Sequence, residues 1–358
     1  MKKNILLISI LLIASLLTIS GCKNDPKNLT ASPSMTSGVT EVPTITHAIE
    51  PSTTIKPTLN LEEQSMEAYK KFMKNEMKLS FDRFMPKDDM GDALYKKGSE
   101  YTLSEVLGIV TANYFEYSTN KKIKDIDFSY IDCGKDAVSE LVLRLNGMDL
   151  YAKDDDSTLV YIIKYIDGKL SLCYYYETWA RSETTINEYG YCHSVGSGGA
   201  SNHGTEYSLI DKDGNWQRIV FIESETDIGQ LTSSDKLGQI PKVAETKGIT
   251  GGIELDTICF DNKEDAANSE EVGNKECFYT FYIYDDNMNQ IKDANLYTNS
   301  IYKEIFDEAK VPFITPDEVS TMISKKDEKL GATDEIKEGK ELKWSTLSGD
   351  LFSEFVGR

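Results

Sequence analysis

Residues 130–145 read YIDCGKDAVSELVLRL, and this stretch indicates how the chain folds. An acidic turn lies between two runs in which every second residue is apolar. Such alternation is typical of half-buried β-strands, so residues 132–139 are predicted to connect the two strands of a hairpin. The alternating apolar residues are Ile126, Phe128 and Tyr130 before the turn and Leu141, Leu143 and Leu145 after it.

Strand signals of the same kind recur along the chain. Asp167-Gly168 and Asp213-Gly214 lie between such segments and predict hairpin turns. Consecutive strands joined by short turns favour an antiparallel meander, so we expect an α+β fold with helices covering one face of the sheet. The predicted strands, rich in Ile, Val, Tyr and Phe, are residues 127–131, 140–145, 159–166, 170–177, 206–210, 216–222, 255–260 and 278–284.

Three helices are marked by capping boxes, in which a polar N-cap residue precedes a glutamate by three positions. In the third of them, Pro316 takes the first helical position, where its missing N–H is not needed. A fourth helix is predicted at residues 300–309. The capping pairs are Asn60 with Glu63, Thr102 with Glu105, and Thr315 with Glu318.

The acidic turn also resembles a cation-binding loop. Over about ten residues it is similar to the DxDxDG calcium loops of dockerin-type and FG-GAP-type domains, in which oxygen ligands alternate and a glycine makes the sharp turn. Here Gly134 and Ala137 stand at two of the positions that define the pattern. Two interpretations remain open: a Ca²⁺ site formed by Asp132, Asp136 and Glu140, or a purely structural hairpin.

Aromatic residues gather at residues 174–176 and nearby. Aromatic faces are natural stacking surfaces for sugars, so Tyr175, Trp179 and Trp216 are candidate ligand-binding residues. The glycine-rich segment 194–204, SVGSGGASNHG, is expected to be a flexible loop beside them. The alternative is that these rings are only the packing of the sheet itself.

The N-terminus reads MKKNILLISILLIASLLTISGC, with a basic head and an apolar middle as in a secretory signal. The small residues before Cys22 resemble the lipobox of bacterial lipoproteins. That resemblance implies cleavage after Gly21 and a palmitate-type diacylglyceryl anchor on Cys22, and two acyl chains suffice for stable membrane attachment. Residues 23–60 are rich in Ser, Thr and Pro and are predicted to be a disordered tether. Residues 61–358 would then form the extracellular globular region.

The charge and the cysteines restrict the partners and the redox chemistry. A formal net charge of −20 argues against nucleic acid, whose phosphates require Lys and Arg. Cys173 with Cys192 and Cys259 with Cys277 are the plausible disulfide pairs, but the odd number of cysteines after Cys22 favours buried free thiols.

These features resemble the uncharacterised surface lipoproteins of Gram-positive bacteria, clostridia in particular. The resemblance implies a location on the outer face of the cytoplasmic membrane. We expect a non-enzymatic domain that binds a cell-wall or other extracellular ligand or partner, and no catalytic residue is assigned. The alternative is an envelope hydrolase with two carboxylates as acid and base, and a purely structural role is a third possibility. The sequence has no GxSxG or HExxH motif that would indicate a serine or zinc hydrolase.

Overall fold

The computed structural model describes residues 59–83, 95–115, 117, 120–153, 156–231, 236–260, 277–285, 287–348 and 350–357. Residues Pro57–Arg358 form one compact unit. The predicted signal, Cys22 and the tether lie outside the described residues. Among those described, no helix has the length and apolarity needed to cross a lipid bilayer.

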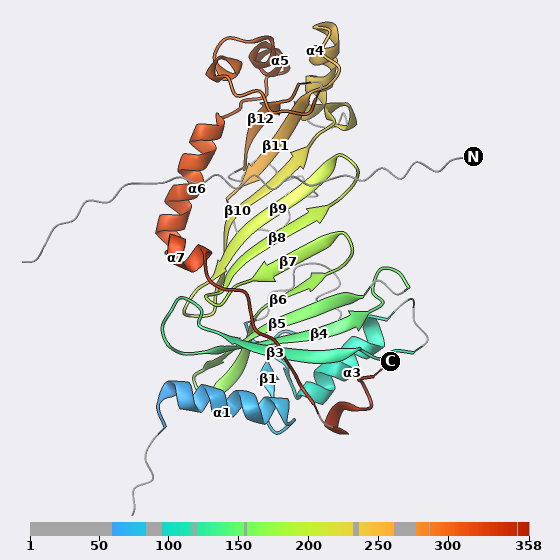
Figure 1. Ribbon diagram of the computed structural model, residues 1–358, viewed down its shortest axis with the longest axis vertical. Coiled ribbons are helices and arrows are strands. Elements are labelled where there is room, and N and C mark those ends of the chain that lie inside the picture. The colour runs from blue at the N-terminus through green and yellow to red at the C-terminus, as the bar shows by residue number, and fades with distance from the viewer. Residues whose placement is uncertain are drawn as a thin grey trace, which may run out of the picture. The chain divides into compact units, whose positions relative to one another are not determined.

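The fold is α+β, as predicted, and its strands form two sheets (Figure 1). The first sheet has the order β13-β3-β4-β5-β6-β1-β2. Strands β3 to β6 form an antiparallel meander, and β1 pairs with β6 in parallel. Its strands are β1 (Leu79–Ser80), β2 (Glu100–Tyr101), β3 (Asp125–Ile131), β4 (Glu140–Met148), β5 (Ser157–Ile166), β6 (Lys169–Thr178) and β13 (Ser345–Thr346).

The second sheet is a six-stranded antiparallel meander in which spatial order follows sequence order. Its strands are β7 (Ser182–Ile186), β8 (Tyr191–Ser197), β9 (Asn202–Ile210), β10 (Trp216–Glu225), β11 (Ile253–Cys259) and β12 (Cys277–Ile283). Each of the eight predicted strands corresponds to one of the observed strands, whereas β7, β8 and the two-residue strands β1, β2 and β13 were not predicted.

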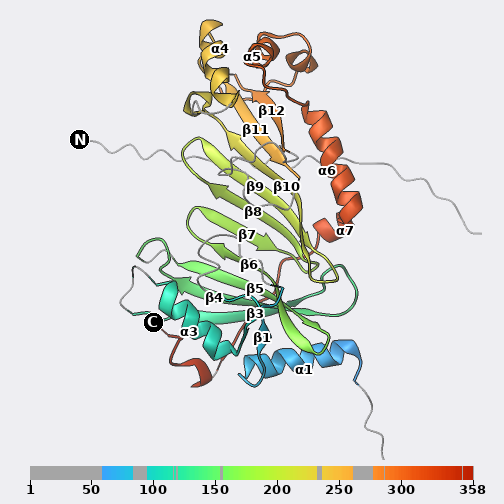
Figure 2. The same cartoon turned by 180° about the vertical axis from the view of Figure 1, so that it is seen from behind.

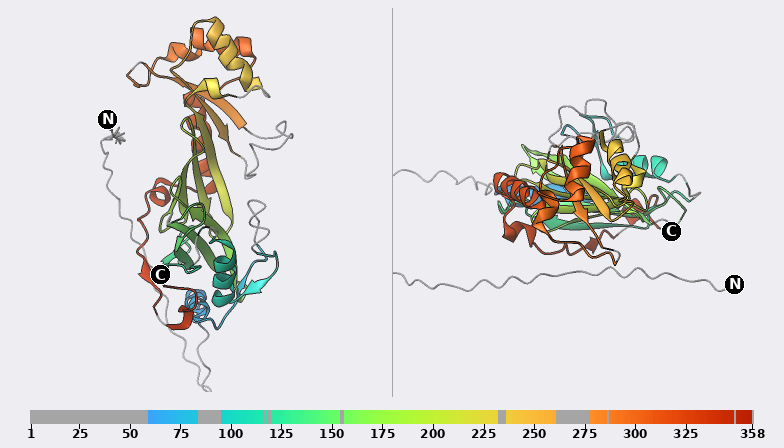
Figure 3. Two further views of the ribbon diagram at one scale, coloured as in Figure 1. Left: turned by 90° about the vertical axis from the view of Figure 1, so that its right-hand side faces the viewer. Right: turned by 90° about the horizontal axis from the view of Figure 1, so that it is seen from above.

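All three predicted capping boxes are present, at the starts of α1, α3 and α6. The predicted helix at 300–309 is α5, which Ser300 caps. Figure 3 shows α4 and α5 side by side beyond the end of the second sheet. The helices are α1 (Leu61–Met73), α3 (Leu103–Asn113), α4 (Ile240–Thr246), α5 (Ile301–Ala309), α6 (Pro316–Leu330) and α7 (Asp334–Lys337), with short 3₁₀ turns at Ile228–Gln230, Lys236–Gln239, Ala294–Tyr297 and Asp350–Phe352.

Helices α1 and α3 pack on one face of the first sheet, whereas helices pack on both faces of the second sheet only near β11 and β12. Phe72 of α1 and Leu107 of α3 are buried against the first sheet, below which the two helices lie in Figure 2. In the second sheet, Leu255 packs with α4 and α5, and Ile258, three residues later, packs with α6 and α7. Residues an odd number of positions apart in a strand point to opposite faces, so these are two separate cores.

A further apolar cluster joins the two sheets. Val142 and Ile162 of the first sheet pack with Cys192 and Ile210 of the second, and all four are buried. The segment after α7, dark red in Figure 1, passes from the second sheet to the edge of the first. There the Arg144 guanidinium lies over the Trp344 ring, with the guanidinium carbon 4.0 Å from the centroid of the ring.

Two expectations are corrected. Segment 194–204 is a loop only at residues 198–201: Ser194–Ser197 belong to β8 and Asn202–Gly204 to β9, because their backbones pair across the hairpin. Cys259 and Cys277 form a disulfide rather than free thiols, since the register of β11 and β12 places them directly opposite each other. The remaining described cysteines, Cys133, Cys173 and Cys192, are thiols that form no disulfide with a described residue, as expected.

Candidate functional site

The predicted cation loop is the β3–β4 connection, and its glutamate is paired with a lysine. Glu140 is fully buried at the start of β4. Its Oε1 contacts the Lys164 ammonium from β5, and its Oε2 accepts a hydrogen bond of 2.7 Å from the Cys133 N–H. The Asp136 carboxylate lies 3.8 Å from the same ammonium. A lysine side chain therefore supplies the positive charge beside two of the three predicted ligands.

The electrostatics of this pair are governed by burial. Loss of solvent raises the pKa of the Glu140 carboxyl to about 7, although Lys164 and the Cys133 N–H oppose the rise. Burial lowers the pKa of Lys164, but the Glu140 and Asp136 carboxylates offset this, so that the net direction is upward.

The other two carboxylates of the loop accept hydrogen bonds from its backbone and so stabilise the turn. Both oxygens of Asp132 accept from the Ala137 N–H, at 3.1 and 3.2 Å, and Asp136 accepts from the Val138 N–H at 2.9 Å. Within the described ranges, no group of three or more His, Cys, Asp or Glu side chains is arranged to hold a metal ion. A calcium site formed by Asp132, Asp136 and Glu140 and a purely structural hairpin both stay open interpretations, and the contact of Lys164 with Glu140 favours the hairpin.

A cavity lies where the two sheets separate. Trp179 and Ser182 close the tight β6–β7 turn through two reciprocal backbone hydrogen bonds, of 2.8 and 2.9 Å. The cavity between β6 and the second sheet has a volume of about 320 Å³, within the range typical of small-molecule sites. It is lined by Tyr174, Tyr175, Tyr176, Glu177, Ser182, Thr184, Ser194, Val195, Gly196, Gly204, Glu206 and Phe221.

The cavity floor is made of small residues on adjacent strands. Ser182, Gly196 and Gly204 pair across β7, β8 and β9 in one row. A Cβ atom added to Gly196 would meet other atoms only at 3.7 Å or more, so space is open above this position. The short side chains leave the floor open beneath the larger aromatic residues.

Rings form the walls, and β-bulges orient them. On β6 the register shifts at Cys173, which turns Tyr174 and Tyr176 toward the second sheet. On β10 a bulge between Arg218 and Val220 brings Phe221 to the same face as Arg218. An extra residue in one strand reverses the faces of all side chains that follow it.

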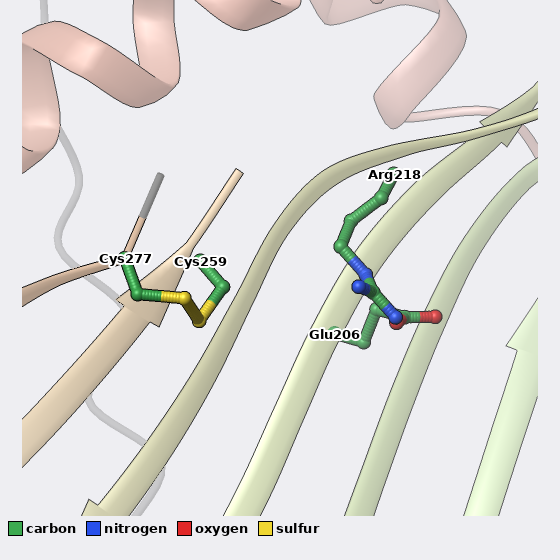
Figure 4. The surroundings of a disulfide bond; sticks show 4 residues. All are labelled: Glu206, Arg218, Cys259 and Cys277. Atoms are coloured by element: carbon green, nitrogen blue, oxygen red, sulfur yellow. A yellow bond between two sulfur atoms is a disulfide. The ribbon is translucent and has the colours of Figure 1, made fainter. Parts of the chain in front are cut away.

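Glu206, which lines the cavity, forms an ion pair with Arg218, and Figure 4 shows the two side chains next to each other. The Arg218 Nε–H and a terminal N–H both donate to Oε2 of Glu206, at 2.8 and 2.7 Å. The Arg218 side chain is only 6% exposed, and its guanidinium lies over the rings of Trp216 and Phe221, at 5.4 and 5.6 Å from their centroids. Glu206 is thereby held in one orientation.

The structure places the three predicted ligand residues differently. Tyr175 borders the cavity, but its ring lies in the core of the first sheet, on the opposite face of β6 from the rings of Tyr174 and Tyr176. Trp216 stacks on Tyr174, with centroids 5.5 Å apart and planes 4° apart, and so supports the wall from behind. Trp179 lies at the turn, where it packs on Tyr151 at 4.6 Å.

Sequence reasoning missed the polar half of the cavity. Thr184 and Ser194 lie on β7 and β8, which were not predicted. Glu206 alternates with the apolar Tyr207 and Leu209 in a predicted strand, so the alternation assigned it, with Ser208, to the polar face and gave no sign of a cavity there. Its salt bridge to Arg218 carried no sequence signal.

A second acidic place lies on the other face of the second sheet. Glu254 and Asp256 are two residues apart on β11 and therefore share a face. Burial raises the pKa of both carboxyls, that of Asp256 to about 6. They lie along one strand instead of facing each other across a cleft, as two hydrolytic carboxylates would.

Comparison with known proteins supplies no relative: no protein-family model, no curated protein and no solved structure matches this chain.

Proposed function

We propose that this protein is a lipid-anchored lipoprotein of the cell envelope that binds a small extracellular ligand in the cavity between β6 and the second sheet. The observation that carries the binding proposal is the cavity itself, about 320 Å³ in volume, with tyrosine rings on one side and hydroxyl and carboxylate groups on the other. An apolar wall with a few fixed polar groups is the usual composition of a ligand site. No nucleic acid is expected as a partner, because the net charge of −20 repels phosphates.

The anchoring proposal rests on the lipobox-like sequence before Cys22. Metabolic labelling with radioactive palmitate should label the wild-type chain and leave Cys22→Ala unlabelled. Label that persists in Cys22→Ala would rule the anchor out.

The binding proposal is tested by filling the cavity. Leucine at Gly196 projects a side chain into the cavity without backbone strain, because Gly196 is not in the left-handed region and has open space. Gly199→Leu is the matched control, since a Cβ atom there meets nothing within 4 Å and the residue does not line the cavity. A small-molecule library is screened by thermal shift against the wild type and both variants.

Compounds that stabilise the wild type and Gly199→Leu, but not Gly196→Leu, would support a binding site in the cavity, because ligands that bind only the folded state raise its stability. If every stabilising compound acts equally on Gly196→Leu, the cavity is not the site. A library without any stabilising compound also counts against the proposal.

A carboxylate-dependent hydrolase stays the alternative, and the raised pKa values of Glu254 and Asp256 are the observation in its favour. Hydrolysis of chromogenic glycosides that is lost in Asp256→Asn would favour it over simple binding.

A further inference from the structure

One row of side chains crosses the cavity face of the second sheet. The strand register aligns Thr184 of β7, Ser194 of β8, Glu206 of β9 and Phe221 of β10. All four line the cavity. The row combines two hydroxyls, one carboxylate and one ring within the width of four strands.

The polar members of the row present an ordered donor and acceptor. The Thr184 hydroxyl donates to Ser194 Oγ at 2.8 Å, so the proton of Ser194 is left for another acceptor. The Nε–H and one terminal N–H of Arg218 both donate to Oε2 of Glu206. The other carboxylate oxygen of Glu206, Oε1, accepts no hydrogen bond from any residue that the structure describes. A hydroxyl donor and a carboxylate acceptor therefore lie in adjacent positions of the row.

This pair discriminates between ligand groups. A ligand hydroxyl can accept from Ser194 and donate to Glu206 at once, because it is both acceptor and donor. A ligand carboxylate has no proton for Glu206, and it meets Glu177 as a second negative charge in the same cavity. An ammonium group has no acceptor for the Ser194 proton.

The remaining walls suit a ring. Tyr174 and Tyr176 have centroids 6.1 Å apart, and Tyr174 is fixed by its stacking on Trp216. Such faces pack against the C–H surface of a pyranose, while its hydroxyls point outward to polar groups.

We propose that the cavity binds an uncharged sugar ring, with a ring hydroxyl bound between Ser194 and Oε1 of Glu206, and with Arg218 as the positioning residue for Glu206. The inference rests on the binding function proposed above and names its ligand class.

The test uses the full chain and titration calorimetry with three probes: N,N′-diacetylchitobiose, its deacetylated glucosamine dimer and digalacturonate. The neutral sugar is expected to bind at least roughly tenfold more tightly than the two charged ones. Glu206→Gln should weaken binding of the neutral sugar roughly 10- to 100-fold, as for loss of a hydrogen bond to a charged group. Ser194→Ala removes the donor without touching the buried ion pair, and should weaken binding roughly three- to tenfold.

Glu183→Gln is the matched control, because Glu183 is an exposed residue of β7 that points away from the cavity. Tighter binding of a charged probe, or full affinity in Ser194→Ala, would overturn the inference. So would the absence of binding to the neutral sugar. If compounds sensitive to Gly196→Leu are then still found in the library screen, only the ligand class is wrong; if none is found, the binding function fails with it.

Discussion

Replacing Lys164 by methionine tests the buried ion pair most directly. Methionine keeps the length and apolar character of the lysine stem but removes the charge. Glu140 then keeps the Cys133 N–H as its donor, while the Lys164 ammonium that also contacts Asp136 is gone. The variant converts a paired buried carboxylate into an unpaired one.

The expected loss follows from the burial of Glu140. With Lys164 present, burial already raises the pKa of this carboxyl from 4.5 to about 7. At about 1.4 kcal/mol per pKa unit, the charged form costs roughly 3 kcal/mol in the folded state even when paired. Breaking a buried pair by removing one partner typically costs about 3–5 kcal/mol, and we expect this loss for Lys164→Met at about pH 8.

The pH dependence has a defined sign. A carboxyl whose pKa is raised on folding contributes stability that is fully present below its unfolded pKa and is lost as the pH rises through the folded value. The window for Glu140 is therefore 4.5 to about 7. At about pH 5 the carboxyl is largely protonated in the folded state, so the loss in Lys164→Met should shrink to about 1 kcal/mol.

Urea unfolding of residues 57–358 at both pH values, followed by tryptophan fluorescence, measures these differences. The double variant Glu140→Gln, Lys164→Met should recover most of the loss at high pH, because no unpaired charge remains. Two results would refute the reasoning. One is a loss of unfolding free energy in Lys164→Met that is equal at both pH values. The other is a double variant whose loss equals or exceeds the sum of the losses in the two single variants.

Three further predictions concern other parts of the molecule. The melting temperature of the wild type should be the same in millimolar calcium as in excess chelator, because Lys164 already pairs with Glu140. A rise in the melting temperature with calcium that Asp132→Ala removes would establish a cation loop instead. Replacing Cys259 and Cys277 by alanine should cost about 3 kcal/mol in urea unfolding, from a sequence separation of 18 residues, and an unchanged midpoint would contradict this. Burial raises the pKa of Asp256 from 3.8 to about 6, so Asp256→Asn should raise the unfolding free energy at about pH 8 by up to about 3 kcal/mol. Near pH 4 the same substitution should have little effect in urea unfolding. Equal effects at both pH values would contradict the burial argument.

Local signals predicted most of the elements. The capping boxes at Asn60, Thr102 and Thr315 located three helix starts because each depends on residues only three positions apart. The turn at Asp167 and Gly168 was predicted because the Asp-Gly pair favours the positive φ that a two-residue hairpin requires, and in the structure both residues adopt it, at 51° and 85°. Strands β7 and β8 were not predicted because Ser, Thr, Gly and His make up much of them, and it is cross-strand pairing that places Ile186 and Cys192 in the core between the sheets.

The candidate site was less readable. Tyr175 and Trp216 were identified from ring chemistry, whereas Glu206, Ser194 and Thr184 were not. Their importance depends on cross-strand register and on the Arg218 salt bridge, both of which join residues from separate strands.

By itself the sequence determined the α+β class, the helix starts, the order of most strands and the acidic surface, because these depend on local spacing and composition. Tertiary structure alone decided that Lys164 meets Glu140, that Cys259 meets Cys277 and that a cavity opens beside β6. The physical reason is that strand pairing sets these contacts across the chain, and a bulge of one residue, as at Cys173, reverses which side chains face the cavity.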